Sequence, residues 1–171
     1  MEKIMKKLSF ILGMCLIPVF GFSQTLTKHI DDMSGKVYFF DSGTYYIDSE
    51  NEKGYRLDGN WDVKDGQPVF RGFFVKVAGI GGCVENVDMI ILFQNGDKIT
   101  KRSFNKFNCD GLCFYAFSNT EIVMLQTLPI DKVRFTNGRG FESVTGQPID
   151  PNFFIEINKK ANNLDYSTSK E

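Results

Sequence analysis

The sequence contains one histidine, and this scarcity narrows the chemistry open to the protein. A Ser-His-Asp or Cys-His site needs a histidine held firmly beside a nucleophile. The single histidine, His29, lies near the N-terminus on a segment that we expect to be loose, and it has no identifiable partner. The sequence therefore offers no candidate catalytic residue, and we interpret His29 as a surface histidine.

Clustered charge and long apolar runs are also scarce. The chain has 20 Lys+Arg and 21 Asp+Glu residues, which are scattered along its length without a basic stripe. Proteins that bind nucleic acid present clustered cations to the phosphate backbone, so nucleic acid is not an expected partner. The longest apolar run, Leu8 to Phe22, is too short to span a bilayer, and we expect no transmembrane segment in the mature chain.

The first 23 residues have the organisation of a secretory signal peptide. Three lysines precede the apolar run, and the small residues Gly21 and Ser23 stand at positions −3 and −1 before Gln24. We predict cleavage before Gln24 and export to the periplasm or the medium. Removing 23 of 171 residues leaves 148, enough for one domain with a real core. The removed segment holds three lysines and one glutamate, so the formal net charge changes from −1 to −3.

A lipoprotein is the alternative interpretation of this segment. It would make Cys15 a lipidated first residue and would anchor the protein to a membrane. Such a site needs a small residue before the cysteine, and Met14 stands there instead. We therefore favour the cleaved signal peptide.

Three cysteines remain in the mature chain, and an oxidising compartment favours one disulfide with one remaining thiol. Cys109 and Cys113 are near enough in sequence to pair, but Cys109 precedes an Asp110-Gly111 turn and Cys113 opens an apparent strand. We favour a Cys83–Cys109 bridge, worth roughly 3–4 kcal/mol in the chain-entropy model, with Cys113 as a small core residue. Zinc is a weaker alternative, because the cysteines and His29 lack paired ligand spacing, and we predict no metal or cofactor.

Short segments rich in aromatic and β-branched residues, separated by turn residues, fill the mature chain. Val69 to Val77 alternates with period two, which predicts Phe73 on one face and Phe70 and Phe74 on the other. Val87 to Phe93 is almost continuously apolar, which predicts a strand buried on both faces, and Asn95-Gly96 predicts a hairpin after it. About ten such strands predict an all-β fold with one short helix, arranged as an antiparallel β-sandwich or barrel.

A few local signals set the remaining boundaries. Ser118 and Glu121 form the pattern of a capping box and predict the one helix, which Pro129 ends. Ser42-Gly43 predicts a tight turn between two strands, and Phe153 to Ile157 is predicted as the last strand. We expect a single β-rich domain over residues 24–158, followed by a polar, disordered tail over 159–171.

Acidic residues give no distinctive site. A pair of carboxylates across a cleft could hydrolyse glycosides, and Asp88 and Glu142 are the most noticeable acids because they interrupt apolar strands. We favour solvent-facing strand positions or bonded turns for both. The segment from Asp58 to Asp62 has oxygen ligands at alternate positions, as calcium-binding loops do. However, Val63 stands where such a loop needs glycine, which favours a polar hairpin loop.

Aromatic residues make up 14% of the chain and give the best candidate for a binding surface. Exposed rings stack on sugars or peptides, although β-rich cores use aromatics as well. Trp61 lies among polar residues and is predicted to be exposed. Tyr45, Tyr46 and Tyr55 are the other candidates for the same surface.

Two stretches resemble small uncharacterised exported β-rich proteins of bacteria with an outer membrane. One runs from Ile80-Gly-Gly-Cys-Val-Glu-Asn86 into Ile90-Ile-Leu-Phe-Gln-Asn-Gly-Asp-Lys98, and the other includes Asn105-Lys-Phe-Asn-Cys109 and Val133-Arg-Phe-Thr-Asn-Gly-Arg139. The resemblance covers roughly residues 36–157 in order and spacing. It implies cysteines matching Cys83 and Cys109, which supports Cys113 as the remaining thiol, and it implies no particular activity or ligand.

Export, the lack of histidine chemistry and the aromatic content together favour a non-catalytic binding domain for a protein or glycan partner. The alternatives are a carboxylate-dependent hydrolase acting on envelope or extracellular glycans, and a structural component of the envelope. A structure can separate the first two. Two close acids in a cleft, one with a raised pKa, favour the hydrolase, whereas a flat aromatic face favours binding.

Overall fold

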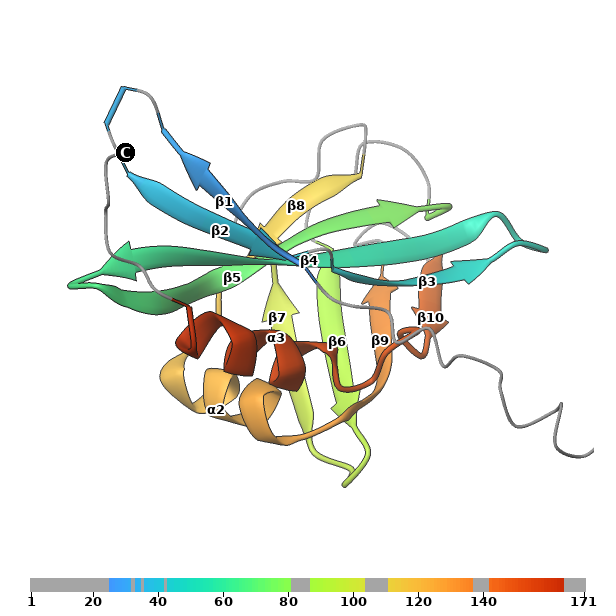
Figure 1. Cartoon of the computed structure of the whole chain (residues 1–171). Helices are drawn as coiled ribbons and strands as arrows, with labels where there is room; N and C mark the ends of the chain where they lie inside the picture. The colour runs from blue at the N-terminus through green and yellow to red at the C-terminus, as the bar shows by residue number, and fades with distance from the viewer. Residues whose placement is uncertain are drawn as a thin grey trace, which may run out of the picture.

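The computed structural model describes residues 25–31, 33–34, 36–41, 43–80, 87–103, 111–136 and 142–164. These residues form two antiparallel sheets and two short helices (Figure 1). The predicted signal peptide, Cys15, Cys83 and Cys109 lie outside the described residues, so the cleavage site and the disulfide stay predictions.

Sheet A has six strands: β1 (Leu26–Ile30), β2 (Val37–Asp41), β3 (Thr44–Asp48), β4 (Lys53–Lys64), β5 (Gln67–Ala78) and β8 (Leu112–Tyr115). Their order is β1-β2-β4-β5-β8, and β3 also pairs with β4. Sheet B has four strands: β6 (Asp88–Phe93), β7 (Lys98–Arg102), β9 (Ile130–Thr136) and β10 (Ser143–Gly146). Their order is β10-β9-β6-β7. The predicted all-β fold is confirmed, with a second helix that the sequence did not predict.

The two sheets face each other with their strands in different directions, as in a sandwich (Figure 1). Sheet A runs across the picture, and the strands of sheet B run below it. Helices α2 (Asn119–Thr127) and α3 (Phe153–Asn162) lie beside sheet B and beneath sheet A, and α3 packs against β1 and β5. Each sheet therefore has an inner face on the core and an outer face toward solvent.

Strands β2 and β3 follow one another along the same side of β4. Phe40 of β2 pairs with Asn60, and Thr44 of β3 pairs with Leu57, so both strands run antiparallel to the same neighbour. The chain therefore keeps its direction between them, and the predicted tight turn at Ser42-Gly43 is wrong. Gly43 has a φ of 68° and lies in the short break between the two strands, where the chain does not reverse. Ser42 lies outside the described residues.

The β4–β5 hairpin turns at Asp65 and Gly66, with φ of 53° and 72°, as two-residue turns of this kind require. The pairing register shifts by one residue beside Gly72. This bulge brings Phe70 onto the inner face with Phe73, where it is buried, and corrects the prediction that Phe70 and Phe74 share a face. Strict period-two counting fails across a bulge because one residue is left out of the ladder.

Aromatic rings fill the space between sheet A and helix α3. Trp61 lies 6.0 Å from Phe154 between ring centroids, and Phe70 lies 4.5 Å from the same ring. Phe154 belongs to α3, whose buried residues Phe153, Phe154, Ile157 and Ala161 recur with the period of a helix. The predicted strand at Phe153 to Ile157 is therefore wrong, because a short aromatic run does not distinguish a strand from a buried helix. The helix continues to Asn162, beyond the predicted start of the disordered tail at Lys159.

Helix α2 begins as predicted. The Ser118 hydroxyl accepts a hydrogen bond from the backbone N–H of Glu121, and the Glu121 carboxylate accepts one from the backbone N–H of Ser118 at 2.7 Å. Lys101 of β7 also donates to this carboxylate at 3.0 Å, which ties the start of α2 to sheet B. These bonds hold the pKa of Glu121 below its usual range against the opposing effect of partial burial.

Candidate functional site

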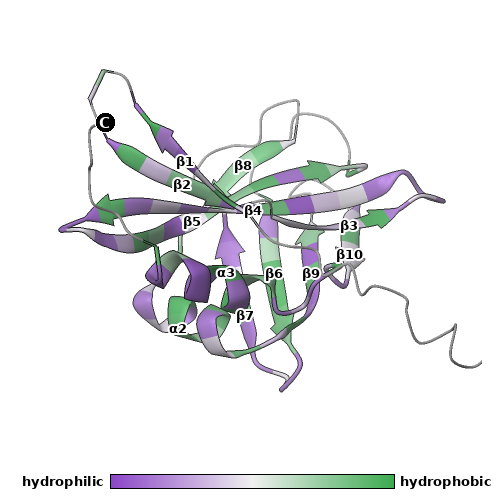
Figure 2. Ribbon diagram, viewed as in Figure 1, coloured by the Kyte–Doolittle hydropathy of each residue, from purple (hydrophilic) through white to green (hydrophobic). Residues whose placement is uncertain are grey.

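The outer face of sheet A carries the candidate site. Along β4 the side chains of Tyr55, Leu57 and Trp61 point to the core, and the intervening residues, including Arg56 and Asp58, point to solvent. The same alternation in β5 and β8 exposes Phe74 and Leu112 on the outer face. Figure 2 shows hydrophobic and hydrophilic positions mixed along these strands, as expected when one face is solvated.

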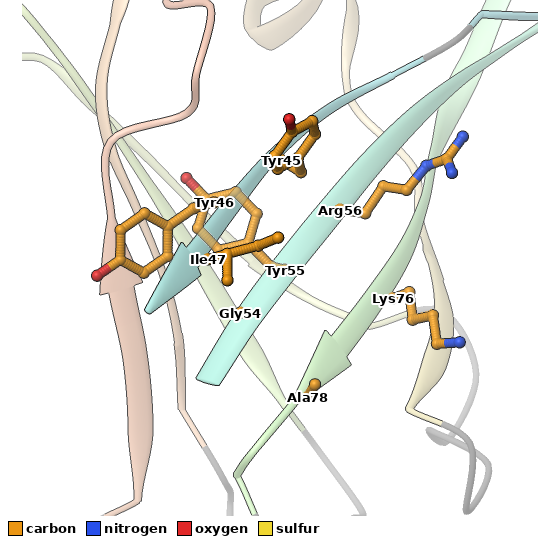
Figure 3. A pocket seen from close by; sticks show the side chains of 8 residues that line it. All are labelled: Tyr45, Tyr46, Ile47, Gly54, Tyr55, Arg56, Lys76 and Ala78. Atoms are coloured by element: carbon orange, nitrogen blue, oxygen red, sulfur yellow. The ribbon is translucent and has the colours of Figure 1, made fainter. Parts of the chain in front are cut away.

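A groove of about 340 Å³ opens on this face, and we call it the tyrosine groove (Figure 3). Its lining residues are Tyr45, Tyr46, Ile47, Gly54, Tyr55, Arg56, Lys76 and Ala78. Gly54 pairs with Ile47 of β3 on one side and with Ala78 of β5 on the other. Because Gly54 has no side chain, the sheet surface between these two strands stays hollow.

The walls of the tyrosine groove differ in chemistry. Tyr45, Arg56 and Lys76 stand opposite one another on β3, β4 and β5. In Figure 3 the side chains of Arg56 and Lys76 extend to the same side, across β4 from Tyr45 and Ile47. Ile47 is 68% exposed, an unusual state for an isoleucine. An apolar wall and a cationic wall therefore flank one hollow.

Three of the four aromatic residues predicted from the sequence line this groove. Tyr45 is exposed at its rim, whereas the side chains of Tyr46 and Tyr55 lie toward the inner face of the sheet, where their rings stack on each other at 5.7 Å. The Tyr55 hydroxyl donates a 2.7 Å hydrogen bond to the Gly146 carbonyl oxygen, which joins sheet A to sheet B. Burial raises the pKa of Tyr55 well above its usual range, so this hydroxyl stays a donor at any ordinary pH.

The predicted exposure of Trp61 is wrong. Its side chain is 1% exposed and points into the aromatic core from the middle of β4. The polar neighbours that suggested a loop, Asn60 and Asp62, are the outward-facing residues of the same strand. Asp58 and Asp62 form no calcium loop either, because they lie in β4 and pair with Arg56 at 2.7 Å and Arg71 at 2.9 Å.

A line of aromatic contacts continues the outer face away from the groove, and we call it the aromatic row. His29 of β1 contacts Phe40 of β2 at 5.3 Å, Phe40 contacts Phe74 of β5 at 5.9 Å, and Phe74 contacts Phe114 of β8 at 5.1 Å. The row crosses nearly the whole width of sheet A. Phe74 is 43% exposed, and next to the row Leu112 is similarly exposed.

His29 belongs to this row and not to a loose leader. It lies in strand β1, where it pairs with Tyr38 of β2. Among the described residues, His29 has only its ring contact with Phe40, so the structure gives it no nucleophile to activate. The sequence did not predict this strand because β1 has few apolar residues.

One acid has a strongly raised pKa, and it lies on the inner face. Asp41 is 7% exposed at the end of β2, and burial raises the pKa of its carboxyl group to about 7, with the nearby Asp58 carboxylate adding to the rise. Asp41 does not line the tyrosine groove, and the groove lining contains no carboxyl group. Asp88, noted from the sequence, forms an exposed ion pair with Arg102 at 3.1 Å. Glu142 is exposed as well.

Cys113 is buried on the inner face of β8, as predicted, and is not part of a disulfide. Cys113 is the one cysteine among the described residues. Within that part, no helix is long and apolar enough to cross a membrane, and no group of three His, Cys, Asp or Glu side chains could hold a metal ion.

Comparison with known proteins adds no relative: the chain matches no family model, no curated protein and no solved structure. The site therefore rests on its own geometry.

Sequence reasoning missed Phe40, Phe74, Phe114, Arg56 and Lys76. One signal was present, since alternation in β5 placed Phe74 and Lys76 opposite Phe73 and Val75. Nothing in the sequence showed that this face stays uncovered, because that depends on where sheet B and the helices pack.

Proposed function

We propose that the protein is an exported, non-catalytic binding domain that recognises a protein or glycan partner through the outer face of sheet A. The observation that carries this proposal is that the tyrosine groove and the aromatic row lie on the same solvent-facing surface, which exposes Ile47, Phe74 and Leu112. Several exposed apolar side chains on one face are typical of interaction sites in soluble proteins. Aromatic and arginine side chains are also the residues that contribute most at interfaces.

The ring geometry favours a protein partner over a glycan. Successive rings of the aromatic row contact one another at interplanar angles between 43° and 78°, so they present edges as well as faces. A sugar ring stacks best on one open aromatic face. Tilted phenylalanines beside Ile47 and Leu112 instead match the apolar side chains of a protein surface.

The alternative of a carboxylate hydrolase needs two acids in a cleft. Asp41 supplies the raised pKa, but its side chain faces the core, while Asp58 points to the outer face and pairs with Arg56. The geometry therefore supports binding better than hydrolysis. Export remains part of the proposal, as does the Cys83–Cys109 bridge, and peptide mapping of unreduced protein tests the bridge.

Two matched variants test the binding surface. Ile47→Asp places a carboxylate in the tyrosine groove, and Val123→Asp places one on helix α2 at a residue that is 55% exposed. Mature wild-type protein and both variants are used to capture partners from envelope extract, before and after protease treatment of the extract. We expect Ile47→Asp to lose a protease-sensitive partner that Val123→Asp retains. Equal capture by all three proteins would contradict the proposed surface, and a protease-resistant partner would favour a glycan.

A further inference from the structure

The outer face of sheet B carries a second groove, of about 270 Å³, which we call the cationic groove. Its lining residues are Ile90, Leu92, Lys98, Lys132, Arg134 and Thr145. It lies on the opposite side of sheet B from α2, whose Glu121 pairs with the inward-facing Lys101. The site is therefore separate from the tyrosine groove and from the core.

Strand register brings the three cations together. Leu92 pairs with Lys98 on one side and with Lys132 on the other, and Ile90 pairs with Arg134. Neighbouring strands lie about 4.8 Å apart and alternate residues of a strand about 7 Å apart, so the three Cα atoms stand within about 12 Å of one another. Long, flexible side chains span this distance easily. The cations are scattered in sequence and form a cluster only in the folded sheet.

Little negative charge balances this cluster. Lys132 has one acidic contact, Asp131 at 3.6 Å, and neither Lys98 nor Arg134 makes an ion pair with any described residue. The groove lining contains no carboxylate. In a mature chain of formal net charge −3, three cations around one hollow are a local concentration of positive charge that favours an anion.

The floor of the cationic groove is apolar. The near-continuous apolar run of β6 predicted a strand buried on both faces, but the structure buries Met89, Ile91 and Phe93 and leaves Ile90 and Leu92 only partly covered. That prediction is wrong because none of the described helices and strands packs on the outer face of sheet B. The methylene chains of flanking lysines shield such residues in part, and the remaining surface can contact an apolar ligand.

We infer that the cationic groove binds a phosphate-bearing amphiphile, with the phosphate held by Lys98, Lys132 and Arg134 and the apolar portion on Ile90 and Leu92. A phosphate monoester carries close to two negative charges at neutral pH, which suits three cations better than a single carboxylate does. The planar guanidinium of Arg134 can donate two parallel hydrogen bonds to its oxygens. A phospholipid and a soluble amphiphile can both present a phosphate joined to an apolar portion.

Calorimetry of the mature protein with octyl phosphate, below the concentration at which it forms micelles, tests the inference. We expect the wild-type protein to bind octyl phosphate. The affinity should fall at least tenfold in the double variant Lys132→Gln, Arg134→Gln. It should be unchanged in Lys64→Gln, a control at an exposed lysine of the β4–β5 turn. Inorganic phosphate should bind more weakly than octyl phosphate because it lacks the apolar portion. Ile90→Thr should weaken the binding of octyl phosphate and leave the binding of inorganic phosphate unchanged.

Sedimentation with phosphatidylcholine vesicles, with and without phosphatidic acid, separates the two sources. Binding only to the anionic vesicles, lost in the double variant, identifies a lipid headgroup, and binding of octyl phosphate alone identifies a soluble amphiphile. The inference is overturned if octyl phosphate does not bind wild-type protein, or if the double variant binds it as tightly. Unchanged thermal unfolding of the variants shows that the fold is retained.

Discussion

The Asp41 carboxylate and the backbone of Gly59 are joined by a 2.8 Å hydrogen bond across the break between β2 and β3. The Gly59 N–H donates to Oδ1, and the Gly43 N–H donates to the same oxygen, also at 2.8 Å. The side chain thus replaces the strand partner that β4 lacks at this position. The second oxygen, Oδ2, is buried beside Trp61 and has no hydrogen-bond partner among the described residues, so the arrangement suits a protonated carboxyl group.

Protonation of Asp41 should make stability depend on pH. Burial raises its pKa from 3.8 to about 7 on folding, and the nearby Asp58 carboxylate adds to the rise. A raised acidic pKa gives full stability below about pH 4, which is lost progressively as pH rises to about 7. The loss is on the order of 4 kcal/mol at 1.36 kcal/mol for each pKa unit. Denaturant unfolding between pH 4 and 8 measures it.

Asp41→Asn is the matched control for this pH dependence. The amide keeps an oxygen acceptor for Gly43 and Gly59 and stays neutral at every pH. Relative to wild type, the variant should therefore gain stability as pH rises from 5 to 8. Parallel stability profiles for the two proteins would show that Asp41 does not titrate in this range.

Truncation of Trp61 should destabilise the fold. The ring is fully buried against Phe70 and Phe154, so Trp61→Ala should cost about 3–5 kcal/mol of unfolding free energy. Trp61→Phe should cost less, because the indole Nε1 has no hydrogen-bond partner in the described part of the chain. Tyr45→Ala at the groove rim should change stability by less than about 1 kcal/mol. Equal losses for Trp61→Ala and Tyr45→Ala in urea unfolding would contradict this assignment.

Gly59 is expected to tolerate no side chain. A Cβ atom there would lie 2.4 Å from the Trp61 ring and 2.9 Å from Asp41 Oδ2, both in the packed core. Gly59→Ala should therefore destabilise by about 1–3 kcal/mol through overpacking, although alanine suits a strand no worse than glycine. Lys64→Ala at the exposed end of the same strand is the control. A thermal midpoint for Gly59→Ala as high as that of the control would refute the close packing.

The capping box of α2 gives a smaller expected effect. Ser118→Ala removes the hydroxyl that accepts from Glu121 and should cost about 0.5–2 kcal/mol. Ser118→Asp keeps a capping acceptor and should retain most of the stability. Chemical denaturation of the three proteins at one pH measures their free energies of unfolding. A Ser118→Ala variant as stable as wild type would mean that tertiary contacts alone stabilise the N-terminus of α2.

The sequence by itself determined the elements whose signals are local. Asp65-Gly66 reverses the chain with a positive φ at both residues, and Asn95-Gly96 does so with a positive φ at Gly96. Ser118 with Glu121 starts a helix by bonding its own backbone. The all-β class and the burial of Cys113 followed from period-two patterns, which reflect the two faces of any sheet. Aromatic content, and not this pattern, suggested Tyr45, Tyr46 and Tyr55 as a binding surface, and all three line the groove.

Only the tertiary structure decided which faces are covered. Trp61 is core because α3 packs over it, Phe154 is helical because its neighbours recur with that period against sheet A, and Phe70 turns inward because of one bulge at Gly72. Ile90 and Leu92 stay partly exposed because no element in the described part of the chain packs on the outer face of sheet B. Both grooves join residues from three or four strands, and strand order is set by long-range pairing that no local pattern specifies.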